Sequence, residues 1–357
     1  MMKKTWLFSV LALLAVLAPR SLVAAPRRDV SPDGDMRRLT IYTWEEMFPQ
    51  EILDGFTEAT GLLINYVNFD TNETMLTRLR TAKGGDYDLV IADDYIIESA
   101  IAEGLLQKLD KSRLPNYGNI NPLYRRPFYD PDDEYTVPYG AGVQTIVYDP
   151  RGVSHAITGY EDLWYPGFRN SLGVTANPRV INGLALKRMG RSYNESDPRV
   201  IADAGQLMLD LAPNIRLIKD DFLDEDLLSG EVSAAVMYTD QATRAMMARP
   251  DFKMVFPKEG IGYGLMGAFI PVNAPNSQGA LAFLDYILDP RRGARCFEHM
   301  GYYCTFAASE PLISPEYRSF LTLPEGFSDA ETIRAVSQEA EEEHERVWTA
   351  FKQAAGK

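Results

Sequence analysis

The stretch LTIYTWEEMFPQEILDGFTEATG, residues 39–61, decides the fold. Residues 39–44 alternate apolar and polar side chains, which predicts a strand. Pro49 begins, and Gly61 ends, a segment with helical spacing. The same order returns twice: strands are predicted at LLINYVNF (62–69) and YDLVIA (87–92), and helices at residues 72–83 and 95–106. Strand–helix alternation of this kind builds a parallel sheet covered on both faces, so the sequence predicts an α/β fold.

The pattern resumes after the segment EYTVPYGAGVQTIVYD, residues 134–149. Strands fit residues 215–219, 232–238 and 267–271, and helices fit residues 180–190, 198–212, 223–230, 277–289, 291–300 and about 330–356. A chain of 357 residues, 46% hydrophobic, is long enough for more than one core. The sequence therefore predicts two lobes.

The first residues have the order of a secretory signal peptide. Lys3 and Lys4 precede an apolar run at residues 7–18, and the small residues Val23, Ala24 and Ala25 follow. We expect residues 1–25 to be removed and the mature chain to be exported to the periplasm. Pro26 disfavours cleavage directly before it, so a cut elsewhere or a retained anchor stays open.

Charge and composition exclude several classes of function. The chain has 36 basic and 50 acidic side chains, a formal net charge of −14, which argues against a nucleic-acid partner. His155, His299 and His344 show no ligand spacing, so we predict no metal, no cofactor and no histidine-based catalysis. Cys296 and Cys304 could pair in an oxidising compartment or remain two buried thiols.

Acidic and aromatic side chains follow three of the predicted strands. They occur in WEEM (44–47), DDY (93–95) and YTD (238–240), where ligands of parallel sheets bind. Each has a structural alternative as well. Trp44 could be core, Glu45 and Glu46 could be favourable charges in a helix's first turn, and Asp93, Asp94 or Asp240 could cap helices. Of Asp93 and Asp94, Asp94 fits the cap better.

Residues 38–350 resemble the periplasmic spermidine/putrescine-binding proteins of bacterial ABC importers. The resemblance is carried by YTWEEMFPQEILDGFTEATG (42–61), NETMLTRLRTAKGGDYDLVIADDY (72–95), EGLLQKLDKSRLPNYGNINP (103–122), YTVPYGAGV (135–143), YEDLWYPGFRNSLGVT (160–175), GEVSAAVMY (230–238), FPKEG (256–260) and MGYY (300–303). It implies a two-lobed, type II periplasmic-binding-protein fold, with each lobe a mostly parallel sheet flanked by helices and two segments crossing between the lobes. We expect the crossings near residues 138–146 and 264–271. Lobe 1 would hold residues 37–140 and about 268–310, and lobe 2 residues of about 141–267 and 311–357, with the ligand cleft between them.

The resemblance also implies a site for an organic cation. A polyamine carries separated ammonium groups on an apolar chain, so carboxylates and aromatic walls suit it, and a cation over an aromatic face gains roughly 0.5–2 kcal/mol. The implied ligand residues are Trp44, Glu45 and Glu46, then Asp93 and Tyr95, then Asn177, Tyr238 and Asp240, and finally Tyr263 and Tyr302.

This chain lacks several acidic residues that the family has. Where spermidine-binding members place an aromatic and an aspartate, this chain has Gly264 and Met266, and the acidic pair of the second lobe falls on Asn177 and Val180. Burying an ammonium without a partner costs several kcal/mol. A smaller diamine, a monocation or a zwitterion therefore fits better than spermidine.

We expect a monomer that captures a small cation such as putrescine by hinge closure and delivers it to the permease of an ABC importer, without catalysis. Other readings remain open. The ligand could be an amino acid derivative or another zwitterion, or ferric iron held by Tyr302 and Tyr303. The chain could be a sensor subunit, or a glycosidase that uses Glu46 and Asp93.

Overall fold

The computed structural model describes residues 37–69, 71–322 and 330–357. The predicted signal peptide at residues 1–25 lies outside these ranges. Within them, no helix has both the length and the apolar character needed to cross a membrane.

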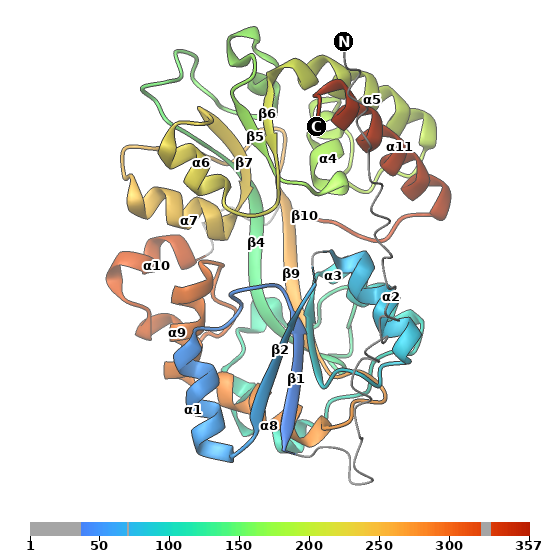
Figure 1. Ribbon diagram of the computed structural model, residues 1–357, viewed down its shortest axis with the longest axis vertical. Coiled ribbons are helices and arrows are strands. Elements are labelled where there is room, and N and C mark those ends of the chain that lie inside the picture. The colour runs from blue at the N-terminus through green and yellow to red at the C-terminus, as the bar shows by residue number, and fades with distance from the viewer. Residues whose placement is uncertain (1–36, 70, 323–329) are drawn as a thin grey trace, which may run out of the picture. The chain divides into compact units, whose positions relative to one another are not determined.

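The strands form one sheet with the order β2-β1-β3-β9-β4-β7-β5-β6 (Figure 1). Their bounds are β1 Arg38–Thr43, β2 Leu63–Asn68, β3 Leu89–Ala92, β4 Thr136–Tyr148, β5 Leu172–Val174, β6 Ile215–Ile218, β7 Ala234–Tyr238, β8 Lys253–Val255, β9 Gly262–Phe269 and β10 Glu331–Thr332. β1 pairs in parallel with β2 and β3, and β5 pairs in parallel with β6 and β7. β4 and β9 run antiparallel between these two groups and connect them, while β8 pairs with β4 and β10 with β9.

The α-helices follow the strands much as predicted. Their bounds are α1 Gln50–Thr60, α2 Asn72–Ala82, α3 Asp94–Ala102, α4 Pro178–Arg188, α5 Pro198–Leu211, α6 Leu223–Ser229, α7 Thr239–Ala248, α8 Ser277–Ile287, α9 Pro290–Met300, α10 Pro315–Leu321 and α11 Gln338–Ala354. Two predicted bounds are wrong. The helix expected from about residue 330 begins only at Gln338, because residues 331–332 pair with β9 instead. The strand expected at 267–271 already begins at Gly262.

Local side chains explain where several helices begin. Thr71, Asn177, Asp197, Asp289 and Ser337 each accept a hydrogen bond from a backbone N–H in the first turn of the following helix. These bonds satisfy donors that have no partner inside the helix. The caps thus fix where each of these helices begins.

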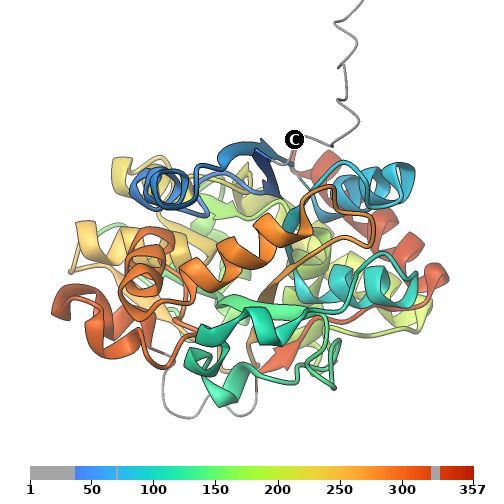
Figure 2. The ribbon, with the colours of Figure 1, turned by 90° about the horizontal axis from the view of Figure 1, so that it is seen from below.

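Apolar side chains on the two faces of each strand group form separate cores. In the β2-β1-β3-β9 group, one face packs against α1, α8 and α9, and the other against α2 and α3. Figure 2 shows α1 and α9 to one side of the molecule and α2 to the other. The β7-β5-β6 group packs against α4, α5 and α11 on one face and against α6 and α7 on the other. Each group therefore carries helices on both faces, as the alternation predicted.

One predicted lobe boundary is wrong. Ile313 and Leu321, at α10, are buried in the same core cluster as Leu39 of β1 and Phe297 of α9. Residues 311–321 therefore belong to lobe 1, although the prediction placed them in lobe 2. The apolar side chains of this segment pack on the core of lobe 1. The chain enters the core of lobe 2 at Ile333 and continues there through α11.

The two connecting strands contain an irregularity. β4 pairs with β9 over residues 136–143 and with β7 over residues 144–148, and its register against β9 shifts between Pro138 and Ala141. Gly140, inside the shift, has φ +93°, and a Cβ there would lie 2.6 Å from Cε of Met266. A residue with a side chain would be strained at this position.

The two cysteines do not form a disulfide. Cys296 and Cys304 are both free thiols and both are buried. Burial raises the pKa of the Cys296 thiol to about 12. Such thiols behave as small apolar side chains in the core of lobe 1.

Candidate ligand-binding site

Polar side chains gather where the parallel strands of both lobes end. β1, β3, β5, β6 and β7 lead into Trp44, Asp93, Thr175, Lys219 and Thr239, respectively. Carboxyl ends of parallel strands meet at one edge of a sheet, so the loops that follow them lie together. The residues that could hold a ligand are in or directly beside these loops.

Asp93 is held by a neighbouring amide and is not used as a helix cap. The Nδ2 atom of Asn72 donates to Oδ2 of Asp93 over 2.8 Å and lies 3.3 Å from the Tyr95 hydroxyl. That hydroxyl donates to Glu73 over 2.9 Å. Asp93 occupies the N-cap position of α3 but makes no side-chain capping bond. The prediction that Asp94 is the cap is wrong, because Asp94 is the first residue inside α3; its carboxylate accepts from the N–H groups of Tyr95 and Leu265.

Burial makes the Asp93 carboxylate unfavourable. It raises the pKa of this group to about 6, the Asn72 bond opposes the shift, and the negative charges of Glu73 and Asp220 add to it. A carboxylate with little solvent and acidic neighbours is stabilised by a cation. Asp93 is therefore electrostatically suited to bind a cation.

Asp220 is the facing acid, and sequence analysis missed it. It follows β6 of lobe 2, and its Oδ1 accepts from the Thr175 hydroxyl over 2.6 Å and from the Ala176 N–H over 3.0 Å. Its charge acts on Asp93 of lobe 1. The signal that drew attention to Asp93, an acid beside the end of a strand, applies equally to Asp220. We call Asp93 and Asp220 the acid pair.

Tyrosines surround the acid pair. Tyr238 and Tyr302 are half-buried. Burial raises the pKa of each hydroxyl well above its usual value, and the negative charge of Asp93 adds to both shifts. Tyr95 packs against the cores of both lobes. We call the acid pair with Tyr95, Tyr238 and Tyr302 the acid–tyrosine cluster; it brings together four of the ten predicted site residues with one that was missed.

Asp240 lies beside this cluster but already has a cationic partner. Its Oδ2 is 3.2 Å from Arg244, which is also 2.9 Å from Asp224. Burial raises the pKa of Asp240, and the Arg244 guanidinium opposes that shift. Because Arg244 already pairs with it, although this guanidinium is shared with Asp224, Asp240 contributes less to an external cation than the acid pair does.

The residues of the first strand-end loop, Trp44, Glu45 and Glu46, lie at the margin of the cluster. Trp44 is half-buried, and its ring centroid lies 4.8 Å from that of Phe69. Glu45 and Glu46 are exposed, and Glu46 has φ +56°. Their charges help to raise the pKa of Tyr66, behind the larger effect of burial. The structure thus places Trp44 partly in the core and leaves both glutamates exposed.

Two further predicted residues have mainly structural neighbours. Asn177 caps α4, and its Oδ1 accepts from the N–H groups of Arg179 and Val180 over 3.0 and 3.2 Å. Tyr263 and Leu265 pack on one face of β9, in the core with α2 and α3, and Met266 packs on the other. Tyr263 therefore lies on the side of the sheet away from Met266.

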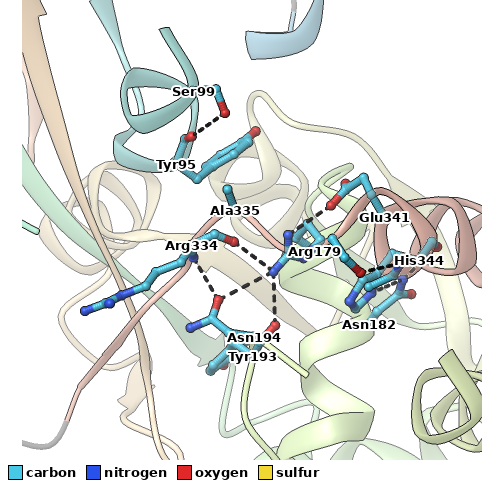
Figure 3. Close-up of polar contacts among 12 residues, drawn as sticks. Tyr95, Ser99, Arg179, Asn182, Tyr193, Asn194, Arg334, Ala335, Glu341 and His344 are labelled. Carbon is cyan, nitrogen blue, oxygen red and sulfur yellow. Dashed lines mark hydrogen bonds and ion pairs between the residues drawn. The ribbon is translucent and has the colours of Figure 1, made fainter. Parts of the chain in front are cut away.

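A buried arginine fixes the first turn of α4 (Figure 3). Arg179 is 3% exposed. Its guanidinium lies 3.0 Å from Glu341 of α11 and donates to the carbonyl oxygens of Tyr193 and Arg334 over 3.3 and 3.2 Å. These contacts connect α4, whose cap is Asn177, to the segment that leads into α11. They hold the lobe 2 side of the site in place.

Carboxylates of the two lobes also face each other outside the acid pair. The pKa of Asp221 in lobe 2 is raised by burial, by Asp220 and by Glu45 of lobe 1. The pKa of Glu345 on α11 is raised by burial, by Glu341 and by Glu73 of lobe 1. Like charges on opposing sides repel, and a cation between them removes the repulsion. No grouping of His, Cys, Asp and Glu in the described ranges could hold a metal ion.

The iron alternative gains no geometric support. Tyr303 is buried in the core with α2 and α3, whereas Tyr302 packs against the core with α1, α8 and α9. Adjacent residues of an extended segment point to opposite sides, so the two phenols do not converge.

Comparison with known proteins places the chain in a family. The model for bacterial extracellular solute-binding proteins matches residues 51–319. The spermidine/putrescine-binding periplasmic protein of Escherichia coli strain K12 is 35% identical over 306 residues, which are 84% of this chain and 86% of that protein. A Listeria monocytogenes structure assigned to spermidine/putrescine ABC transport is 25% identical, with a TM-score of 0.83 over 88% of this chain and 99% of the other. A spermidine/putrescine ABC transporter substrate-binding protein from Streptococcus pneumoniae is 27% identical, with a TM-score of 0.77 over 89% and 99%.

Proposed function

Because this chain belongs to the bacterial extracellular solute-binding protein family and has its two-lobed, type II fold, we propose that it binds a small organic cation of the polyamine class. The ligand sits between the lobes, at the acid–tyrosine cluster. The observation that carries the proposal is the acid pair: Asp93 of lobe 1 is bonded to Asn72, and the negative charge of Asp220 of lobe 2 adds to the rise of its pKa. Three tyrosines lie close to Asp93. A cation bound to both carboxylates joins the two lobes, which favours their closed arrangement.

The charge inventory favours a cation over a zwitterion. A cationic side chain is the strongest partner for the carboxylate of an amino acid derivative, and Arg244, beside the cluster, already pairs with Asp224 and Asp240. At two positions where the resemblance to spermidine-binding members implies an acid, this chain has Val180 and Met266. These side chains are 1% and 6% exposed and lie in apolar cores. Two carboxylates suit putrescine better than the longer, more highly charged spermidine.

We further propose that the chain is exported to the periplasm, acts as a monomer, and passes its ligand to the permease of an ABC importer without chemical change. The names of the relatives support this role, and the family consists of solute-binding proteins. Release to a permease requires a reversible closure, and a ligand held only by ion pairs and aromatic contacts meets that requirement.

Titration calorimetry of the mature protein, unfolded and refolded to remove bound ligand, tests the proposal. Putrescine, cadaverine, spermidine, agmatine and several amino acids form the panel. We expect putrescine to saturate one site, and Asp220→Asn to weaken it at least tenfold, because a charge-assisted bond contributes roughly 1.5–3 kcal/mol. Asp203→Asn is the matched control, since it removes the same charge from the exposed face of α5. A folded protein that ignores every amine, or an Asp220→Asn variant with unchanged affinity, contradicts the proposal.

A further inference from the structure

An open space lies in the middle of β9, beside Gly264. Apart from its two neighbours in the chain, no described residue has a heavy atom within 4 Å of a Cβ placed on Gly264. The other described glycines with such free surroundings, residues 61, 104, 118, 190, 230 and 356, are all exposed. Gly264 is half-buried and belongs to a central strand of the sheet. Side chains normally fill such a position, because interiors are close-packed.

The open space adjoins the ring of Tyr302. Gly264 of β9 pairs in register with Gly142 of β4, and directly paired residues of antiparallel strands present their side chains on the same face. A Cβ on Gly142 would lie 2.8 and 2.9 Å from Cδ1 and Cε1 of Tyr302. The Tyr302 ring therefore covers Gly142, and the space over Gly264 continues along the edge of that ring.

Tyr302 connects this space to the acid pair. Burial raises the pKa of its hydroxyl, and the negative charges of Asp240 and Asp93 add to the shift, so the hydroxyl end of Tyr302 is on the side of the carboxylates while its ring covers Gly142. Beyond Gly264 on the same face of β9 lies Met266, whose Cε atom approaches Gly140. The surroundings thus change from acidic at Asp93 to aromatic at Tyr302 and to apolar at Met266.

We propose that the preferred ligand is an amine with a bulky apolar or aromatic substituent, such as an arylalkylamine. This inference rests on the proposed function, since the ammonium binds the acid pair. The ring of the ligand occupies the space over Gly264 and packs against Tyr302. Aromatic rings stack favourably with an offset or edge-to-face geometry and bury much apolar area. A second ammonium at this place would meet glycine and methionine, which offer no carboxylate.

The test compares phenethylamine with butylamine and putrescine by titration calorimetry of the ligand-free protein. We expect phenethylamine to bind at least tenfold more tightly than butylamine, because both have one ammonium and only phenethylamine has a ring. Gly264→Leu and Gly264→Trp fill the space and should reduce this ratio to about one. Gly118→Trp adds the same side chain at an exposed glycine far along the sequence and should leave the ratio unchanged. The thermal midpoint of each variant checks folding, and Gly264→Leu serves if the tryptophan is not tolerated.

The outcomes separate the two levels of the proposal. If phenethylamine no longer binds more tightly than butylamine in both Gly264 variants, while the Gly118→Trp control keeps the difference, the site for the ligand's ring over Gly264 is supported. If putrescine binds but phenethylamine is no tighter than butylamine, the cation site stands and the ring site is refuted. If the folded protein binds none of the three amines, the proposed function fails, and the ring site fails with it.

Discussion

Acidification should weaken the binding of cations through Asp93. Burial raises the pKa of this carboxyl to about 6 in the ligand-free protein. A bound ammonium stabilises the carboxylate, so proton and cation compete for Asp93. The affinity must then fall as the pH falls through 6. The ionised fraction drops from about ten elevenths at pH 7 to about one eleventh at pH 5, so we expect putrescine to bind about tenfold more weakly at pH 5. The ligand's own amines stay protonated across this range.

Calorimetry at pH 5, 6 and 7, in two buffers of different ionisation enthalpy, measures this effect. We expect binding at pH 6 to release part of a proton, because the cation displaces it from Asp93. Asp93→Asn should weaken binding at pH 7 and remove most of the pH dependence, which also separates Asp93 from the neighbouring Asp94, whose pKa burial raises as well. Equal affinity at pH 5 and 7, with no proton released, would refute the reasoning.

Three further predictions concern stability, measured by urea unfolding. Burial lowers the pKa of His344 to about 3 from an ordinary 6.5, so between these two pH values the unfolded chain binds more protons than the folded chain. The free energy of unfolding should therefore fall by up to about 1.4 kcal/mol for each pH unit as the pH drops from 6.5 to 3. His344→Leu should flatten this dependence on pH. Arg179→Met should lower the free energy of unfolding by about 2–4 kcal/mol, because buried carbonyl oxygens lose their hydrogen-bond donor. Arg199→Met, which removes an exposed ion pair, should lower it by under about 0.5 kcal/mol. Equal losses in the two variants would contradict the role of burial. Gly140→Ala should cost about 1–3 kcal/mol from the positive φ and the Met266 contact, and Gly118→Ala, with neither feature, should cost less; the reverse order would rule out this account.

The repetitive part of the fold could be predicted from the sequence because it depends on local signals. Pro49 and Gly61 bound α1 as predicted, and Gly61 adopts φ +73°, the left-handed conformation that ends helices. The strand ends that carry Trp44, Asp93 and Tyr238 follow from the same alternation. These features need only hydrophobic period and capping residues, which short stretches of sequence contain.

Other features depend on partners that are remote in the sequence. The glycine-rich start of β9 lacks a strand pattern, and its pairing with β4 and β10 decides its conformation. Glu331 of β10 is held by Lys187 at 2.5 Å, a contact that no local signal predicts. The ion pair of Asp240 with Arg244 lies within about one turn of α7, but the burial of Asp240 and the sharing of Arg244 with Asp224 on another helix depend on the tertiary fold. Asp220, by contrast, could have been found with the strand-end rule alone.

The position of β9 in the sheet has a consequence for how the chain is made. β9 lies between β3 and β4, so the inner edge of β3, complete at residue 92, has no partner until residues 267–269 have been synthesised. An edge strand without a partner can pair with another chain. Contacts of such long sequence separation also form slowly. Lobe 1 can therefore close only late in synthesis, and the interval before β9 emerges is when the nascent chain most needs protection from aggregation.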